Sequence, residues 1–224
     1  MTSPVVYSLT DRIATLQMDD GKANAMAPAM SAGLNAGLDR AAADGARAVV
    51  IRGRSGLLSG GFDLKIIRGD DEALKAKMRE DGMMLLKRLY LSPQPIVFAV
   101  TGHAVAMGAL LLLAGDVRIG TAGDFRIGLN EVGIGLSLPI AGIELARDRL
   151  LPTELSRAVI NAQLYRPDEA AAIGYLDQVA KADAFDERVR QAAAALAELD
   201  PEAFAETKRR VRQPTLDRIA ARGA

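Results

Sequence analysis

The sequence contains no cysteine and no tryptophan, and its one histidine is His103. Without cysteine the chain cannot form disulfides, thiolate nucleophiles or cysteine-based metal sites. A single histidine also argues against a histidine-cluster metal site and against a Ser-His-Asp triad. We therefore expect no metal in the functional site, and a structural or solvated role for His103.

The sequence also lacks an excess of either charge. Lysine and arginine total 28 residues, and aspartate and glutamate total 28. Proteins that bind nucleic acids or anionic membrane surfaces usually carry a basic excess. Only 4% of the residues are aromatic, so platforms for base stacking are not evident. We expect neither a nucleic-acid partner nor a membrane partner.

Long apolar runs are absent as well. The longest, residues 104–115, is far shorter than the ~20 residues that cross a bilayer. The first residues, Met-Thr-Ser-Pro-Val-Val-Tyr, lack the basic start and apolar core of a signal peptide. These features predict a cytoplasmic protein.

Short apolar segments alternate with helical patterns along the chain. Expected strands cover 5–9 and 13–18, which form a hairpin, and then 48–51, 96–100, 117–119 and 125–127. Expected helices begin at Pro28 and cover 74–91 and 108–114; residues 56–63 are expected to be a loop, and the chain beyond Pro139 to be all helix. This α/β pattern implies largely parallel strands. A doubly wound sheet and a coiled β-β-α superhelix both agree with it.

Two glycine-containing loops each follow an apolar strand. They are Leu-Ser-Gly-Gly-Phe-Asp-Leu (58–64) and Gly-His-Ala-Val-Ala-Met-Gly (102–108). The second leads into an apolar helix, whose first N–H groups lack intrahelical partners and could hold a developing oxyanion. Neither loop contains a dinucleotide fingerprint or a P-loop. Each could also be a tight turn with no chemical role.

Glu131 is the only charged residue between Arg126 and Glu144. If its apolar surroundings bury it, its pKa rises, and a carboxylate with a raised pKa suits a general base near neutral pH. The alternative is that Glu131 lies in an exposed turn beside Asn130.

In this order, the motifs resemble those of the crotonase (enoyl-CoA hydratase/isomerase) superfamily. They are Gly-Lys-Ala-Asn-Ala (21–25), Ser-Gly-Gly-Phe-Asp-Leu (59–64), the loop at 102–108, Gly-Asp-Val-Arg-Ile (115–119) and Phe-Arg-Ile-Gly-Leu-Asn-Glu-Val-Gly-Ile-Gly (125–135). The resemblance implies a crotonase-like β-β-α superhelix with a helical C-terminal region. It divides the chain into a core, 1–195, and a short C-terminal helical segment, 196–224.

The resemblance also implies site residues. It assigns the oxyanion-binding N–H groups to Phe62 and Met107, the base to Glu131, and the acyl pocket to Leu110 and Leu136. The residues that it implies for coenzyme A binding are Lys22, Ala23, Ser59, Gly61, Asp63 and Leu64. The implied partner is an acyl-CoA substrate, with no separate cofactor. The implied assembly is a homotrimer or a dimer of trimers.

Within this resemblance, Leu110 is the residue that distinguishes between the hydratase and isomerase reactions. Hydratases of the superfamily carry a glutamate at this position in addition to the one that matches Glu131. A single glutamate suits the shift of a double bond from C3 to C2, and residues 127–131 also resemble 3,2-enoyl-CoA isomerases. The alternatives are a hydratase, thioester hydrolysis, decarboxylation, or a non-catalytic acyl-CoA-binding subunit.

The basic run Lys208-Arg209-Arg210 has two interpretations. The simpler one is a solvated helical face. The resemblance suggests that a lysine in this region could approach a coenzyme A phosphate of a neighbouring subunit.

Overall fold

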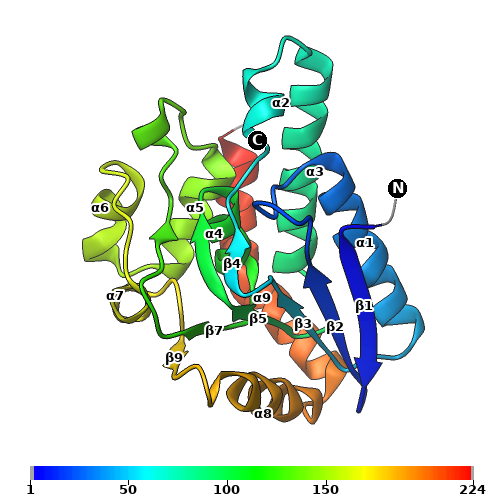
Figure 1. Ribbon diagram of the computed structural model, residues 1–224. Helices are drawn as coiled ribbons and strands as arrows, with labels where there is room; N and C mark the ends of the chain where they lie inside the picture. The colour runs from blue at the N-terminus through cyan, green and yellow to red at the C-terminus, as the bar shows by residue number, and fades with distance from the viewer. Residues whose placement is uncertain (1–2, 223–224) are drawn as a thin grey trace.

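The larger of two sheets lies in the lower half of the molecule as drawn (Figure 1). The computed structural model describes residues 3–222; residues 1, 2, 223 and 224, which include the end of the predicted segment 196–224, lie outside the described part. Within the described residues the sheet has six strands in the order β1-β2-β3-β5-β7-β9. They are β1 (Val5–Thr10), β2 (Ile13–Met18), β3 (Ala48–Arg52), β5 (Ile96–Val100), β7 (Val117–Thr121) and β9 (Gln178–Ala180). Only the β1–β2 hairpin is antiparallel.

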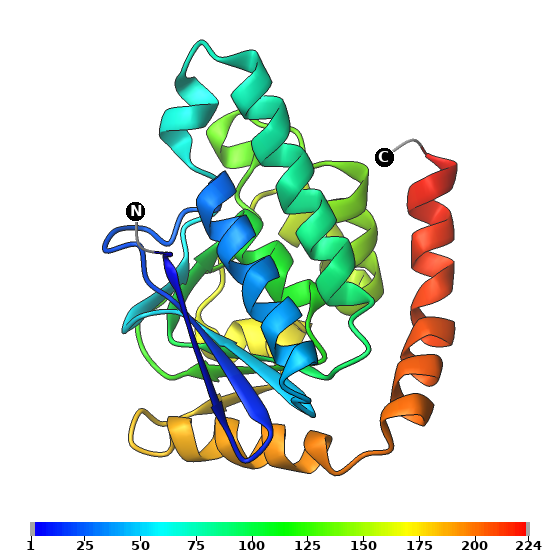
Figure 2. The same cartoon turned by 90° about the vertical axis from the view of Figure 1, so that its right-hand side faces the viewer.

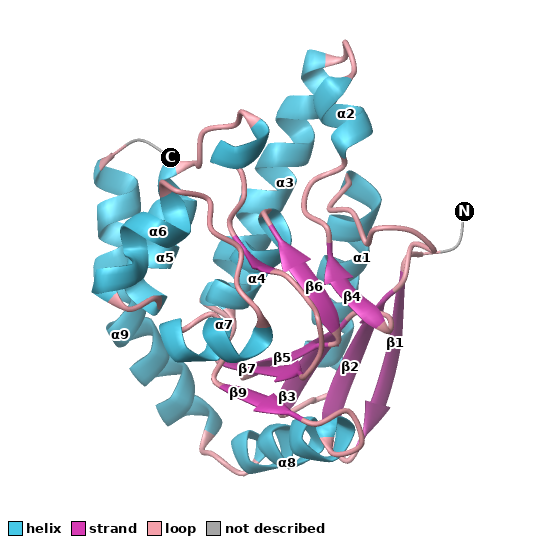
Figure 3. Cartoon of the chain, turned by 60° about the vertical axis from the view of Figure 1, so that its left-hand side comes forward, coloured by secondary structure: helices cyan, strands magenta, loops and turns pink. Residues whose placement is uncertain are grey.

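The smaller sheet contains three parallel strands in the order β4-β6-β8, above the larger one (Figure 3). They are β4 (Gly56–Ser59), β6 (Gly102–Val105) and β8 (Ile127–Gly128). Each follows a strand of the larger sheet by a few residues, so the chain alternates between the sheets. This arrangement confirms the coiled β-β-α superhelix and rules out the doubly wound sheet.

The helices fill the space around both sheets. They are α1 (Pro28–Ala43), α2 (Leu64–Arg68), α3 (Glu72–Tyr90), α4 (Met107–Ala114), α5 (Ile140–Arg149), α6 (Leu155–Val159), α7 (Pro167–Ile173), α8 (Phe185–Ala197) and α9 (Pro201–Ala221). Short 3-10 turns cover Val132–Ile134 and Pro152–Glu154. The predicted boundary at 195/196 falls inside α8, and the division of the chain into two segments stays a prediction.

Three local expectations were wrong. The expected loop at 56–63 begins with β4, the loop at 102–108 begins with β6, and β9 interrupts the expected all-helical region. β4 and β6 pair with each other at Gly56 and Gly102, where a methyl group on Gly102 would lie 1.9 Å from the carbonyl carbon of Gly56. These glycines allow two backbone segments that are distant in the sequence to approach closely. In the sequence alone, glycines of this kind are easily taken for a loop.

The central strands β3 and β5 of the larger sheet are buried on both faces, which explains their continuous apolar sequences. In β5, Ile96 and Phe98 belong to the main core, whereas Val97 and Ala99 belong to a second cluster with residues of α8. Figure 2 shows α8 lying beneath the larger sheet and α9 turning upward from its end along the side of the molecule. Helix α8 therefore closes the lower face of the sheet.

Helix α9 is fastened to the core by a nearly buried ionic cluster. Asp116 accepts hydrogen bonds from the Ile96 N–H at 2.8 Å and from Lys208 Nζ at 2.6 Å, and it lies 2.8 Å from the guanidinium of Arg212. The side chains of Lys208 and Arg212 are each 5% exposed. The expectation of a solvated face at 208–210 was therefore wrong for Lys208, because the fold places a carboxylate from a distant turn against it.

No helix within residues 3–222 is both long enough and apolar enough to cross a membrane.

We predict that Asp116→Ala lowers the free energy of unfolding by roughly 3–5 kcal/mol, because Lys208 and Arg212 would remain buried without their counter-ion. Urea denaturation would measure the loss. The control is Glu206→Gln, which removes exposed pairs with Arg209 and Arg210 and should change stability little. Equal effects of the two variants would contradict the structural role of Asp116.

Candidate active site

The first predicted N–H donor, Phe62, follows β4 and a pair of glycines. Gly61 has a φ of +94°, a conformation that side chains disfavour. A methyl group on Gly61 would lie 2.9 Å from Ala106 Cβ and 3.4 Å from Met107 N, so the two glycine-containing loops are in contact. Gly82 of α3 lies beneath the Phe62 ring, where a methyl group would approach it to 2.7 Å. The sequence therefore brings Phe62 and Met107 close together through glycine contacts.

The second predicted donor, Met107, is the first residue of α4. The preceding Ala106 has φ 52° and ψ −124°, an uncommon conformation for a residue with a side chain. Its own N–H donates to Gly128 O at 3.0 Å, which ties the turn to β8. Among the described residues, the N–H groups of Phe62 and Met107 donate to no protein acceptor. Two free N–H groups at adjacent positions are what an oxyanion site requires.

Glu131 precedes the 3-10 turn that follows β8, and the residue is only 8% exposed. Its carbonyl oxygen accepts hydrogen bonds from the N–H groups of Ile134 and Leu136, which fix the backbone. Oε2 is buried and has no hydrogen-bond partner among the described residues. Burial raises the pKa of Glu131 to about 7, against a smaller lowering by a backbone hydrogen bond. The exposed-turn alternative was wrong.

A cavity of about 330 Å³ joins these elements. It is lined by Phe62, Ile67, Arg79, Met83, Leu110, Glu131, Leu136, Ser137 and Pro139. The structure thus places the predicted base, one predicted N–H donor residue and both predicted acyl-pocket residues at one cavity. Met107 is fully buried and is not among the residues that line this cavity. Arg79 and Ser137 were missed by sequence analysis, because neither lies in a recognisable motif.

The residues predicted to bind coenzyme A lie outside the wall of this cavity, on two joined loops. Ser59 Oγ donates to Asn24 O at 2.7 Å, and the Gly60 N–H donates to Ala23 O at 2.8 Å. Of the six predicted residues, three are exposed, namely Lys22, Ala23 and Leu64, whereas Ser59 and Gly61 are buried and Asp63 is half-buried. The Asp63 side chain also caps α2 by accepting from Lys65 N at 2.8 Å. Their role in binding stays a prediction.

Asp20 and Asn24 shape the first of these loops, and sequence analysis gave Asp20 no role. The Asp20 carboxylate accepts from the N–H groups of Lys22, Asn24 and Ala25 at 2.7–3.0 Å. Burial opposes ionisation, but these bonds hold the pKa of Asp20 below its usual value. The fully buried Asn24 amide donates to Met18 O and Leu58 O, which connects the loop to β4. The aspartate-to-amide spacing could have indicated such a turn.

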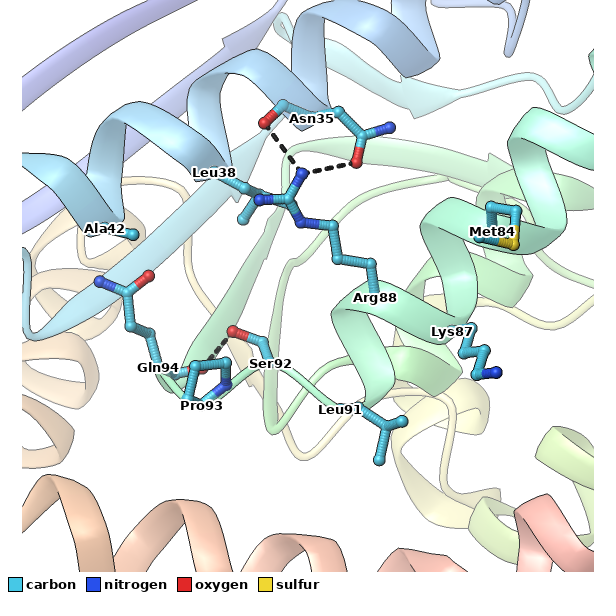
Figure 4. Close-up of a pocket in the computed structure, with 10 residues that line it drawn as sticks. All are labelled: Asn35, Leu38, Ala42, Met84, Lys87, Arg88, Leu91, Ser92, Pro93 and Gln94. Carbon is cyan, nitrogen blue, oxygen red and sulfur yellow. Dashed lines mark hydrogen bonds between the residues drawn. The ribbon is translucent and has the colours of Figure 1, made fainter.

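A larger cavity, about 680 Å³, lies elsewhere, between α1 and α3 (Figure 4). Arg88 crosses it and donates to Asn35 O and Oδ1. It contains none of the predicted site residues. Size alone would have selected this cavity, whereas the predicted base and acyl-pocket residues lie at the smaller one.

The architecture and the loops around Glu131 define a member of the crotonase superfamily. More narrowly, the chain belongs to the enoyl-CoA hydratase/isomerase family, whose sequence model matches residues 9–222. The resemblance that the motifs indicated is thereby confirmed.

Solved structures agree over nearly the whole chain. An enoyl-CoA hydratase/isomerase family protein from Pseudomonas syringae is 43% identical, with a TM-score of 0.93, over 97% of this chain and 94% of that one. A Mycobacterium tuberculosis protein, named an enoyl-CoA isomerase with one solved structure and a probable enoyl-CoA hydratase with another, is 41% identical, with a TM-score of 0.93, over 99% of this chain and 96% of that one.

A curated relative from Thermus thermophilus, provisionally named an enoyl-CoA hydratase, is 33% identical over 168 residues. The match covers 72% of this chain and 65% of the relative, so it spans slightly less than two thirds of that protein. The names of relatives therefore include both reactions of the family.

We predict that Glu131→Gln stabilises the fold in a pH-dependent way. The pKa of Glu131 is about 7 in the folded protein and near 4.5 when unfolded, so wild-type stability falls as pH rises through this window. The glutamine variant does not lose stability in this way. Its free energy of unfolding should exceed that of the wild type by an amount that grows from pH 4.5 to 7 and then levels off at roughly 2–4 kcal/mol. Urea denaturation at several pH values would test this. A constant difference would contradict the burial of an ionisable Glu131.

Proposed function

We propose that this chain is an enoyl-CoA isomerase that converts a 3-enoyl-CoA to a 2-enoyl-CoA. The observation that carries the proposal is that, among the described residues lining the cavity, Glu131 is the one carboxylate. Double-bond migration needs one base that removes a proton and then returns it. Hydration needs a pair of carboxylates that activate water and deliver a proton.

The reaction begins with substrate bound so that its thioester oxygen accepts hydrogen bonds from the N–H groups of Phe62 and Met107. Ionised Glu131 takes a proton from C2, and the electron pair moves onto the thioester oxygen to give a dienolate. The two N–H groups stabilise this negative charge as it develops. Protonated Glu131 then returns the proton at C4, and the double bond forms between C2 and C3. The atoms balance without any cofactor, since coenzyme A is part of the substrate.

Leu110 supports this assignment over hydration. Its side chain is 1% exposed and lines the cavity from α4. An apolar group at this position cannot activate water, and the loss of one acid–base group typically costs ~10²–10⁴-fold in rate. Leu110 and Leu136 instead provide apolar surface for the acyl chain.

The proposed assembly is a homotrimer or a dimer of trimers that binds acyl-CoA. The apolar groove between α3, α5 and α9 supports burial of this side of the protein, because it contains Met84, Leu216 and Ile219. Light scattering at micromolar concentration tests the proposal, and a stable monomer would contradict it.

We predict that Glu131→Gln reduces the isomerisation rate by at least ~10²–10⁴-fold, because an amide cannot act as a base near neutral pH. Single-turnover conversion of a 3-enoyl-CoA measures the rate, and calorimetry with the same ligand measures affinity, which should remain. Glu198→Gln, an exposed glutamate far along the chain, is the matched control. A Glu131→Gln variant with the wild-type rate would eliminate the proposed mechanism.

The isomerase rate should also depend on pH. Glu131 acts in its ionised form, so kcat/KM should rise with pH and level off above an apparent pKa of about 7. A pH–rate profile on a 3-enoyl-CoA provides the measurement. A profile that is flat between pH 5 and 8 would show that a different group limits the reaction.

A further inference from the structure

Arg79 is an unpaired cation on α3. Elsewhere on this helix, Lys75 lies 2.6 Å from Glu72 and Lys77 lies 2.9 Å from Asp81. No carboxylate of the described residues lies within ion-pair distance of Arg79, and it makes no hydrogen bond that would hold its guanidinium. The reason is visible in the sequence: the positions three and four residues from Arg79 hold lysine, alanine, glycine and methionine, so no acid lies at helical spacing.

Arg79, an exposed residue of α3, lines the same cavity as Glu131. The rest of the wall is largely apolar, with Phe62, Met83 and Leu110 among its members. Ser137 adds one hydroxyl. A cavity with a base, an apolar wall and a free cation offers three chemically distinct surfaces to one ligand.

Arg79 and Glu131 occupy separate parts of this wall, because Arg79 is exposed on α3 whereas Glu131 is buried on the turn that follows β8. A guanidinium within a few ångströms of a carboxylate would favour its ionised form and lower its pKa. The pKa of Glu131 is instead raised by burial, and no cation offsets this effect. The two residues also form no ion pair. A ligand that contacts both must therefore extend along the apolar wall between them.

We propose that Arg79 binds a carboxylate at the far end of the acyl group, so that the preferred substrates are acyl-CoA thioesters of dicarboxylic acids. The proposal rests on the proposed function, because that function places the thioester and C2 beside Glu131. From there the methylene groups of the chain contact the apolar wall and the terminal carboxylate reaches Arg79. The planar guanidinium can bind a carboxylate through two parallel hydrogen bonds. A plain fatty acyl chain would leave this cation without a partner.

Binding of saturated thioesters tests the proposal without requiring catalysis. Adipoyl-CoA and hexanoyl-CoA have equally long acyl chains and differ in the terminal carboxylate, while free coenzyme A reports on the phosphates. Calorimetry would compare wild type, Arg79→Gln and the control Lys87→Gln, which removes an exposed cation of α3 outside this cavity. Arg79→Gln should weaken adipoyl-CoA binding by roughly 10–100-fold, the range for a hydrogen-bonded charge. Hexanoyl-CoA and free coenzyme A should bind as before.

Two outcomes would overturn the proposal. An equal loss for all three ligands would assign Arg79 to the coenzyme A phosphates, and no loss for any of them would leave it a solvated side chain. Arg79→Lys should recover part of the affinity for adipoyl-CoA only, because it restores the charge without the planar fork. Failure of the Glu131→Gln rate test would refute the isomerase mechanism but would leave these binding results interpretable.

Discussion

The burial of helix α4 is the constraint on which the other elements depend. All eight of its residues, Met107–Ala114, are buried, so the sheets and the surrounding helices must enclose it on every side. Its first turn lies so close to β4 that a methyl group on Gly108 would come within 2.5 Å of Ser59 O. The same contact that completes the core therefore holds the Met107 N–H beside the Gly61–Phe62 loop. The packing of α4 in the core and the geometry of the candidate oxyanion site therefore depend on the same contacts.

Three carboxylates removed from solvent show how the protein treats buried charge. Asp116 is neutralised by Lys208 and Arg212. Glu144, completely buried, is paired with Arg218 of α9 and with Arg222 just beyond its end. Burial works against the ionisation of Glu144, but these arginines hold its pKa below the usual value. Glu131 has no such partner, and burial raises its pKa. The two paired carboxylates attach α9 to the core, whereas the unpaired one has the properties of a base. The cost of removing a carboxylate from water is offset by ion pairs at Asp116 and Glu144, whereas at Glu131 it is not offset and raises the pKa.

The cavity beside Glu131 has a composition that suits an extended acyl group. Its apolar members come from five separate segments, namely the loop after β4, α2, α3, α4 and the stretch after the 3-10 turn at Val132–Ile134. Arg79 of α3 adds a positive charge to this largely apolar wall. Selection among acyl-CoA substrates would then depend on what lies at the end of the chain, while the thioester chemistry stays the same. Such a division agrees with a superfamily in which one scaffold serves several reactions.

The sequence by itself determined the hairpin, the apolar strands β3, β5 and β7, the long helix α3 and the identity of Glu131 as the isolated charge, because each depends on local pattern. Only the tertiary structure decided that Gly56 and Gly102 belong to paired strands, that Lys208 is buried against Asp116 and that Arg79 faces Glu131's cavity. These features join residues that are far apart along the chain. Whether a charge is solvated, paired or left alone depends on which distant groups surround it, and local sequence does not contain that information.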